Sequence, residues 1–273
     1  MTDEHIGNKQ SEIYLDQHYP EQFLQAEVLA TLSHELRGPL AIIKGYVTTL
    51  LRYDHMLDPA ERTDFLKAID EGSDRLATSI DQLMELAQME SDAIALHPTT
   101  ISLPHLLRTA ITKFERTVPG RQFRFSQISC DFSPFEHDIL LQADHSRLLI
   151  AFENILDNAL KYSDSVVEVT LSPVCTDEEK EHLTAYKGVD ASQMIAVIIR
   201  DYGMGIPADK LEQIFGRFQR VDLGLTRQVN GLGLGLTISK HLIELHQGSI
   251  WAESKVGFGT TMHILLPTSS SIA

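Results

Sequence analysis

The segment ENILDNALKYSD, residues 153–164, gathers side chains suited to binding a metal ion and phosphate. Asn154, Asn158 and Lys161 recur at steps of four and three, so they share one face of a helix. Amide oxygens suit a hard cation such as Mg²⁺, which commonly takes further ligands from substrate phosphates. The lysine supplies a positive charge for the same phosphates. Taken alone, the run is equally compatible with an ordinary polar helix face.

Three later segments add groups that suit a nucleotide: DYGMGIP at 201–207, FGRFQRV at 215–221 and NGLGLGL at 230–236. Asp201 follows a hydrophobic strand and could accept a hydrogen bond from an exocyclic amine. The glycines permit tight turns and close backbone approach, and amides at a helix start can cradle phosphate. The glycine spacing fits neither a Rossmann fingerprint nor a P-loop. Single glycines are weak signals, because any turning loop uses them.

The segment SHELRGPL, residues 33–40, places His34 beside Glu35. Apolar residues around it recur at steps of three and four, which predicts one seam of an amphipathic helix. The seam consists of Leu29, Leu32, Leu36, Leu40, Ile43, Val47 and Leu50. His34 lies about 200° from Leu32 around that helix, so it is expected to face solvent. These residues alone fit a functional histidine and an incidental solvated one equally well.

The elements that hold this histidine form a predicted helical hairpin. One helix is expected from residue 21 to about Tyr53, and Asp58-Pro59-Ala60-Glu61 has the residues of a capping box at the start of a second. The second helix ends before His97-Pro98 and has its own seam, which consists of Ile69, Ser73, Leu76, Ile80, Leu83 and Ala87. A single hairpin encloses no core, so pairing of two hairpins into a four-helix bundle predicts a homodimer.

After Pro98 the pattern changes to alternating helices and strands, which predicts an α+β sandwich with helices on one face of a mixed sheet. The expected helices cover residues 102–116, 144–162, 207–215 and 234–247. The expected strands cover residues 121–126, 138–142, 165–172, 193–201, 248–254 and 258–266. The connection at 173–192 is long and acidic, so it is expected to be an exposed loop without a chemical role.

Composition excludes several partners. The chain has 273 residues and a net charge of -15, which repels nucleic acid and anionic lipid. Cys130 and Cys175 lie far apart outside any CxxC pair, which suits a reducing cytoplasm and argues against a cysteine-zinc site. No apolar run approaches the roughly 20 residues that span a bilayer, and no signal peptide opens the chain. The expectation is a soluble cytoplasmic protein.

The order of these segments carries a resemblance to the transmitter core of bacterial two-component sensor histidine kinases over about residues 21–267. SHELRGPL resembles their H box, ENILDNALKYS their N box, DYGMGIP their first glycine box, IFGRFQRVD their F box and GLGLGL their second glycine box. The closing VGFGTTMHILLP is similar to the end of their ATP-binding domains. The resemblance implies a dimeric helical hairpin followed by an α/β-sandwich ATP-binding domain of the Bergerat type.

The implied domains are a tail or connector at 1–20, the dimerisation and histidine-phosphotransfer hairpin at 21–96, the ATP-binding domain at 97–268 and a tail at 269–273. The resemblance implies ATP and Mg²⁺ as cofactors, a homodimer, and a response-regulator receiver domain as phosphate acceptor. The input signal is not visible, because only about 20 residues precede the hairpin. The chain is expected to be a soluble kinase or the cytoplasmic portion of a membrane receptor.

The resemblance also assigns roles to individual residues. His34 would be the phosphoacceptor and Glu35 the general base. The nucleotide site it implies comprises Asn158 as Mg²⁺ ligand, Asn154 beside it, Lys161 and Tyr162 near phosphate or ribose, Asp201 on the adenine amine, Arg220 near the γ-phosphate, and Gly203, Gly205, Gly231, Gly233 and Gly235 in the glycine boxes. Residues 216–235 would form a mobile lid over ATP.

Three rival functions share parts of this pattern. Gyrase, Hsp90 and mismatch-repair ATPases carry a water-activating glutamate four residues before the magnesium asparagine, where this chain has Asn154; Glu153 is about 100° out of register. Kinases of the mitochondrial dehydrogenase-kinase type also use this fold, but the H box and dimerisation hairpin of this chain favour histidine as acceptor. A nucleotide-binding scaffold that docks a regulator without transferring phosphate is the non-enzymatic alternative.

Gly38 departs from the family pattern, because many members carry threonine or asparagine four residues after the phosphoacceptor. In those proteins the side chain helps position the water that dephosphorylates the regulator. Glycine offers that water no hydrogen bond, so weak regulator phosphatase activity is expected beside an intact kinase.

Overall fold

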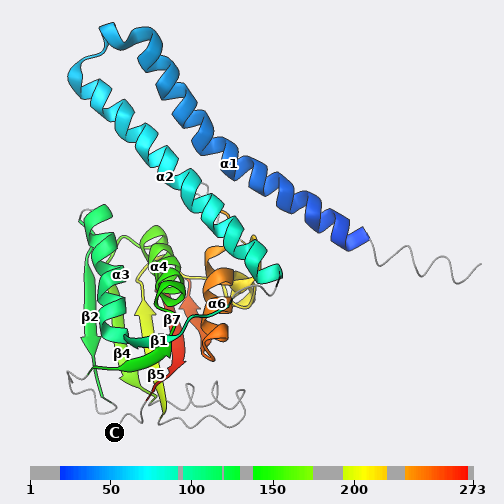
Figure 1. Ribbon diagram of the computed structural model, residues 1–273, viewed down its shortest axis with the longest axis vertical. Coiled ribbons are helices and arrows are strands. Elements are labelled where there is room, and N and C mark those ends of the chain that lie inside the picture. Colours follow the sequence, from blue (N-terminus) through cyan, green and yellow to red (C-terminus); the bar gives the residue numbers. More distant parts are fainter. Residues whose placement is uncertain are drawn as a thin grey trace, which may run out of the picture. The chain divides into compact units, whose positions relative to one another are not determined.

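The computed structural model describes residues 19–91, 95–118, 120–129, 138–174, 193–219 and 231–269 (Figure 1). It contains two compact units: the chain up to Leu83 with residues 230–232, and the remainder from Met84. Arg220, most of the expected lid, most of the acidic loop, and nearly all of the two expected tails lie outside the described residues. The predicted domain boundary between residues 96 and 97 stays a prediction.

The first unit is a helical hairpin of α1 (Tyr19–Tyr53), a short 3₁₀ turn η1 (Asp54–Met56) and most of α2 (Pro59–Glu90). The predicted capping box forms at the start of α2. The Asp58 side chain accepts hydrogen bonds from the backbone N–H groups of Ala60 at 2.7 Å and Glu61 at 2.8 Å, and Glu61 accepts one from Asp58 N–H at 3.0 Å. These bonds satisfy amide donors that the first helical turn leaves unpaired.

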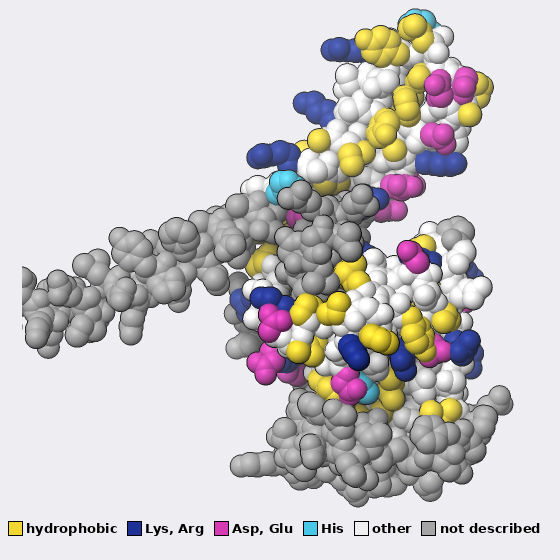
Figure 2. Space-filling model, turned by 180° about the vertical axis from the view of Figure 1, so that it is seen from behind, with side chains coloured by type: hydrophobic (Ala, Val, Ile, Leu, Met, Phe, Trp, Pro, Cys, Tyr) yellow, Lys and Arg dark blue, Asp and Glu magenta, His cyan; other side chains and the backbone are white. Residues whose placement is uncertain are grey.

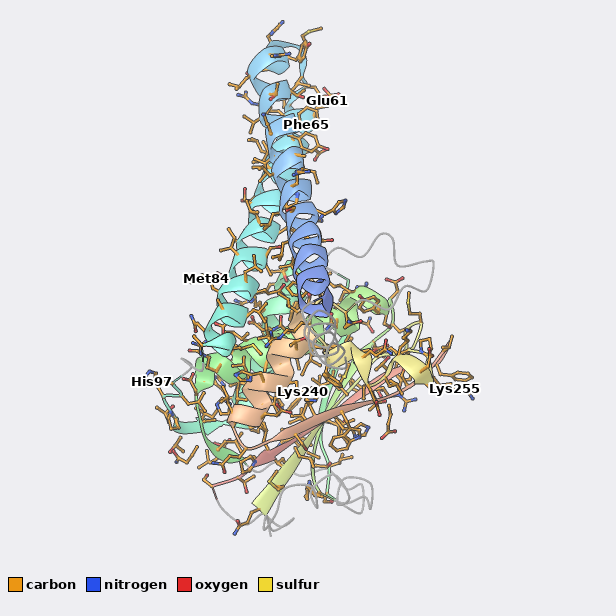
Figure 3. The ribbon with its side chains drawn as sticks, turned by 90° about the vertical axis from the view of Figure 1, so that its right-hand side faces the viewer. Glu61, Phe65, Met84, His97, Lys240 and Lys255 are labelled. Atoms are coloured by element: carbon orange, nitrogen blue, oxygen red, sulfur yellow. The ribbon has the colours of Figure 1, made fainter. Side chains whose placement is uncertain are left out.

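The two helices of the hairpin pack through complementary shapes. The rings of Tyr46 and Phe65 lie 4.9 Å apart, and Figure 3 labels Phe65 near the turn end of α2. Further along, Gly72 is buried, and a Cβ built there would lie 3.0 Å from Cγ1 of Ile43. A glycine therefore lets the two helices approach closely at this level.

Much of the hairpin's apolar surface is left uncovered by the described residues of one chain. Of the seam residues, Leu40 is 54% exposed and Ile80 is 48% exposed. Leu51 and Leu66 are also exposed, and Figure 2 shows hydrophobic side chains at the surface of the hairpin. The hairpin has the amphipathic character that the spacing predicts, with apolar side chains left in contact with solvent.

The second unit is built on a five-stranded sheet in the order β2-β4-β5-β7-β6. Its strands are β2 (Phe123–Gln127), β4 (Val167–Pro173), β5 (Met194–Arg200), β6 (Ser249–Lys255) and β7 (Gly259–Pro267). Strands β2 and β4 are parallel and the other neighbours are antiparallel, so the sheet is mixed as predicted. Helices α3 (Leu103–Thr117), α4 (His145–Tyr162) and α6 (Gly235–Leu245) cover one face (Figure 1).

The core lies between these helices and the sheet. Phe152 and Leu156 of α4 have no exposed surface, and neither do Val169 and Val197 of the sheet. The Ser239 hydroxyl of α6 donates to the Ala151 carbonyl of α4 at 2.9 Å. The buried face of α4 thereby holds its polar face at a fixed angle to the sheet.

Two local predictions were wrong. The segment 207–215 forms two short 3₁₀ turns, Ala208–Lys210 and Gln213–Phe215, in place of one α-helix. Pro207 and Gly216 bound the segment and its backbone makes i→i+3 bonds, such as Lys210 N–H to Pro207 O at 2.9 Å. In addition, the strand expected at 138–142 lies outside the main sheet: β3 (Leu140–Ala143) pairs with β1 (Thr99–Ser102), a strand that the sequence did not predict.

Candidate nucleotide site and phosphoacceptor hairpin

The polar face of α4 is the first component of the site. The N-terminus of this helix is capped by Asp144, whose side chain accepts a hydrogen bond from Arg147 N–H at 3.1 Å. Asn154, Asn158 and Tyr162 follow at four-residue intervals and are all half-buried. Within the described part of the chain, neither carboxamide is engaged in a hydrogen bond. Both amide oxygens are therefore suited to accept a ligand, as the spacing predicts.

The start of α6 meets this face. A Cβ built on Gly235 would lie 3.5 Å from Oδ1 of Asn154, so the second glycine box and the N box are neighbours. Among the residues that the structure describes, no side chain caps the first turn of α6. Backbone N–H groups at an uncapped helix start bind anions well, because their dipoles and hydrogen-bond donors point in the same direction.

The loop after β5 closes against the end of α4. A Cβ on Gly203 would lie 2.0 Å from the Tyr162 carbonyl oxygen, and one on Gly205 would lie 2.2 Å from that of Lys255. Gly205 also has φ of 70°, which side chains disfavour. Lys255, labelled in Figure 3, ends β6. These two glycines let one loop approach α4 on one side and the β6–β7 turn on the other.

Asp201 is buried at the base of this loop, with 8% of its surface exposed. Its Oδ1 accepts hydrogen bonds from Gly203 N–H at 2.8 Å and Thr260 N–H at 3.3 Å. Burial raises the pKa of the carboxyl group, and the two backbone bonds oppose that rise. Both of these bonds end on Oδ1, so the lone pairs of Oδ2 can accept a hydrogen bond from an amine.

Strand β7 contributes a contact that sequence reasoning missed. Thr260 donates its N–H to Asp201 and accepts from Asp201 N–H through its carbonyl, at 2.9 Å. Gly259 beside it has φ of 96°, and a Cβ there would lie 2.1 Å from the Asp201 carbonyl oxygen. The GFGTT segment thus supports the acid, and its clustered glycines were the only local signal.

The second glycine box alternates two kinds of residue. Leu234 is completely buried, whereas Gly231 and Gly233 have φ values of 152° and 68°. A Cβ on Gly233 would lie 2.8 Å from the Gln219 carbonyl oxygen. Glycine at this position therefore allows the backbone before α6 to pass close to the end of the F box.

Charged residues beside the asparagines are paired. The ammonium of Lys161 lies 2.6 Å from an Asp157 carboxylate oxygen, one turn back on α4. The Glu153 carboxylate lies 2.6 Å from Nζ of Lys113 on α3, and its side chain is only 21% exposed. Glu153 is thus engaged with α3, as expected of a residue rotated away from the Asn154 and Asn158 face.

On the hairpin, His34 is exposed and Glu35 is half-buried. Leu32 and Leu36, on either side of them, are half-buried as members of the seam. His34 therefore faces solvent on a helix, as its spacing predicts.

Comparison with known proteins agrees with both units. The family model described as "His Kinase A (phospho-acceptor) domain" matches residues 24–92, and the model described as "Histidine kinase-, DNA gyrase B-, and HSP90-like ATPase" matches residues 143–270. Together they match most of the chain, in the order expected of a transmitter core. The chain belongs to the sensor histidine kinases.

Two relatives show how much of such a kinase the chain represents. It is 31% identical over 243 residues to the sensor histidine kinase WalK of Bacillus subtilis, covering 88% of this chain and 36% of the relative. It is 32% identical over 247 residues to the sensor protein kinase WalK of Staphylococcus aureus, covering 88% and 53%. This kinase core spans between a third and about half of the relatives' lengths.

Solved structures share the fold. The Acinetobacter baumannii histidine kinase AdeS matches with a TM-score of 0.60 at 18% identity, over 87% of this chain and 98% of that one. The histidine kinase ThkA, solved in complex with the response regulator protein TrrA, matches with a TM-score of 0.61 at 21% identity, over 97% and 68%. In the described part of this kinase core, no helix is both long and apolar enough to cross a membrane.

Proposed function

We propose that this chain is a kinase core that transfers the γ-phosphoryl group of Mg-ATP to His34 and then to an aspartate of a response-regulator receiver domain. The observation that supports this most strongly is the combination of two sites in one chain. One is an exposed histidine beside a glutamate on a helical hairpin. The other is a buried carboxylate and two open carboxamides around an uncapped helix start.

The nucleotide is held by groups of matching chemistry. Asp201 accepts a hydrogen bond from the adenine amine, and the amides at the start of α6, with Gly231, Gly233 and Gly235, hold phosphate oxygens. Asn158 binds Mg²⁺ with support from Asn154, and this ion neutralises charge on the phosphates when bound. Lys161 and Tyr162 contact phosphate or ribose. Arg220, which lies outside the described residues, approaches the γ-phosphate.

The acceptor step needs a free imidazole nitrogen. A lone pair of His34 forms the N–P bond while the bond between the γ-phosphorus and its bridging oxygen breaks, and ADP leaves. Glu35 takes the proton that the imidazole loses and orients the ring. The exposed position of His34 leaves it open first to the nucleotide and then to a receiver domain.

Water is a poor competitor for the phosphoryl group. Two carboxylates directly precede the asparagines, and both are engaged: Glu153 pairs with Lys113 and Asp157 pairs with Lys161. Without a positioned base, water is not activated for attack. This arrangement favours histidine as acceptor over rapid ATP hydrolysis.

Partners follow from the same proposal. The chain acts as a homodimer whose hairpins cover each other's exposed seams, and it passes phosphate to a response regulator; the ThkA structure contains a regulator protein bound to a kinase of this fold. It works in the bacterial cytoplasm, attached to a membrane only through a sensor region outside this chain.

Labelling with γ-³²P-ATP and Mg²⁺ tests the kinase proposal. The wild-type protein should acquire label that is acid-labile and alkali-stable, and His34→Gln should acquire none. His55→Gln is the matched control, because His55 is an exposed histidine on the same hairpin and should leave labelling unchanged. Nucleotide binding without label in the wild type would instead favour the scaffold function.

Regulator phosphatase activity is a second test. A Cβ on Gly38 meets no atom within 4 Å, so the site has room for a larger side chain. Gly38→Thr should increase dephosphorylation of the cognate regulator while autophosphorylation persists, because the hydroxyl can orient water. An unchanged dephosphorylation rate would contradict the proposed defect.

A further inference from the structure

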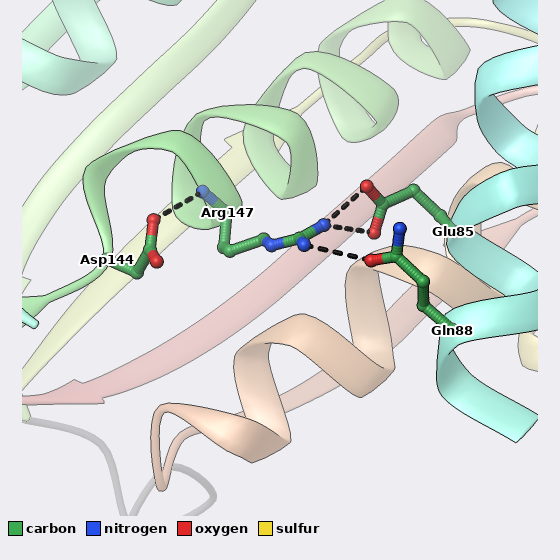
Figure 4. A network of polar contacts seen from close by, with 4 residues as sticks. All are labelled: Glu85, Gln88, Asp144 and Arg147. Carbon is green, nitrogen blue, oxygen red and sulfur yellow. Dashed lines mark hydrogen bonds and ion pairs between the residues drawn. The ribbon is translucent and has the colours of Figure 1, made fainter. Parts of the chain in front are cut away.

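Arg147, in the first turn of α4, joins two residues of α2. Its guanidinium forms an ion pair with both carboxylate oxygens of Glu85 and donates a hydrogen bond to Oε1 of Gln88 at 3.0 Å (Figure 4). Glu85 and Gln88 precede Arg147 by 62 and 59 residues. We call these three residues the α2–α4 clamp.

The clamp differs from the surface ion pairs of the hairpin. The side chains of Arg147 and Glu85 are 20% and 16% exposed, whereas those of Lys67 and Asp64 are 69% and 75% exposed. Arg147 contacts Glu85 through Nη1 and Gln88 through Nη2, and engagement of two nitrogens of the planar guanidinium fixes its orientation as well as its distance. Partial burial also limits screening by salt, so this pair restrains its elements more strongly than an exposed pair does.

Asp144, at the start of α4, is hydrogen-bonded to two other parts of the chain. The Asp144 carboxylate caps α4 and also accepts a hydrogen bond from His97 N–H at 3.0 Å, in the segment that leads from α2 to β1. Asp144 N–H donates to Nε2 of His246, at the end of α6, at 3.0 Å. The same helix carries Asn154 and Asn158 further along, so a force on its first turn acts on the element that holds the phosphate site.

The other end of the clamp lies on a helix that spans both compact units. Helix α2 is continuous from Pro59 to Glu90, but the boundary between the units falls between Leu83 and Met84. Glu85 and Gln88 are in the first turns after that boundary. Met84, labelled in Figure 3, is 57% exposed, whereas Leu86 is only 8% exposed, so buried apolar surface and the clamp both hold this part of α2.

We propose that the α2–α4 clamp restrains movement of the ATP-binding domain about the end of α2, and that it opens during each cycle of autophosphorylation. This inference rests on the proposed kinase function. The γ-phosphate must first reach His34, and His34 must then be open to a receiver domain, so the domain occupies at least two placements. A restraint at the joint opposes exchange between them.

The test compares variants that break the clamp with a control on the same helix. Arg147→Met and Glu85→Gln should each raise the autophosphorylation rate at saturating Mg-ATP about three- to tenfold, a range that loss of one ion pair can supply. Binding of a non-hydrolysable ATP analogue should change by less than about twofold. Asp64→Asn removes an exposed acid from α2 and should leave the rate unchanged.

The charge-exchanged double variant Glu85→Arg with Arg147→Glu supplies the decisive comparison. It should return the rate toward the wild-type value, because the pair is restored with opposite polarity. The proposal is overturned if the single variants leave the rate unchanged or lower it while thermal unfolding shows them folded, or if the double variant matches the singles. A wild-type protein that binds the analogue but acquires no label would instead overturn the kinase function.

Discussion

The hairpin and the ATP-binding domain bury their apolar residues in different ways. In the domain, helices and sheet enclose side chains such as Phe152 and Leu156 completely. In the hairpin, Leu40 and Ile80 are about half-exposed although they occupy the seam. Two helices have no third layer, so one chain cannot cover both sides of their apolar stripes. The domain closes its core alone, whereas the second chain of the proposed homodimer would cover the hairpin.

The largest expected effect comes from charging the exposed seam. Combining Leu40→Asp with Ile80→Asp should abolish dimerisation, because two pairs of carboxylates would be buried without partners in the bundle. Light scattering should show a fall from twice 30.6 kDa to 30.6 kDa. Lys44→Asp, at an exposed polar position of α1, is the control and should remain dimeric. A dimer that survives the double substitution would refute a bundle built on this seam.

A core substitution should show the opposite pattern. Phe152→Ala empties a fully buried site on α4 and should destabilise the ATP-binding domain by about 3–5 kcal/mol. Analogue binding should be lost on mild heating while the hairpin still holds two chains together. Leu51→Ala, at a side chain that is 82% exposed, should change the free energy of unfolding by less than about 0.5 kcal/mol.

A Phe152→Ala protein that no longer dimerises would contradict this expectation. Loss of dimerisation in Phe152→Ala would mean that the hairpin depends on the folded domain, and the separate cores would then not act independently.

Local patterns were sufficient to predict the hairpin and most of the domain. The Asp58 and Glu61 capping residues act on neighbouring amides, and strands such as 193–201 were recognisable as continuous apolar runs. The sequence did not predict β1, because this strand is only four residues long and is formed by its pairing with β3. The 207–215 segment has helix-compatible residues, but its two ends are fixed by tertiary contacts and by Pro207.

The contacts of the candidate site likewise divide into those that local sequence patterns predict and those that they do not. Asn154 and Asn158 could be grouped from helical spacing, and the DxGxG loop from its glycines. The support that Thr260 gives Asp201, and the contact of Arg147 with Glu85, join residues that are 59 and 62 positions apart. No periodicity links positions at such separations, because only the folded sheet and helices bring them together.

A smaller effect distinguishes function from stability within the domain. Asp201→Asn should weaken binding of an ATP analogue about tenfold or more, because its amide cannot accept from adenine as well as a carboxylate does. The same variant should be slightly more stable without nucleotide at pH 7.5, by about a few degrees in Tm. Burial raises the pKa of Asp201, so the charged form of this side chain is disfavoured in the fold.

The sign of this pH effect can be checked directly. A raised folded-state pKa contributes stability below the unfolded value of 3.8, and that contribution is lost as pH rises through the folded-state value. The Tm advantage of Asp201→Asn over wild type should therefore shrink as pH falls toward 4. An advantage that stays constant with pH would show that charge burial is not its cause.

The smallest expected effect concerns His246, whose ring is buried at the end of α6 with 7% of its surface exposed. Its Nδ1 lies 2.7 Å from the Leu242 carbonyl and its Nε2 accepts from Asp144 N–H, so the neutral ring satisfies both contacts. Burial lowers the pKa of His246 below its ordinary value of 6.5. The unfolded chain thus binds a proton more readily than the folded domain does, and stability falls as pH drops below 6.5.

Urea unfolding at pH 7.5 and 5.5 measures how much the titration of His246 contributes to the stability of the ATP-binding domain. Wild type should lose stability at pH 5.5, and His246→Gln should lose less because glutamine does not titrate. The amide can still accept from Asp144 N–H, which keeps the comparison focused on charge. Equal losses in the two proteins would assign the acid sensitivity to other groups, whereas a smaller loss in the variant shows that burying this ring makes the domain sensitive to acid.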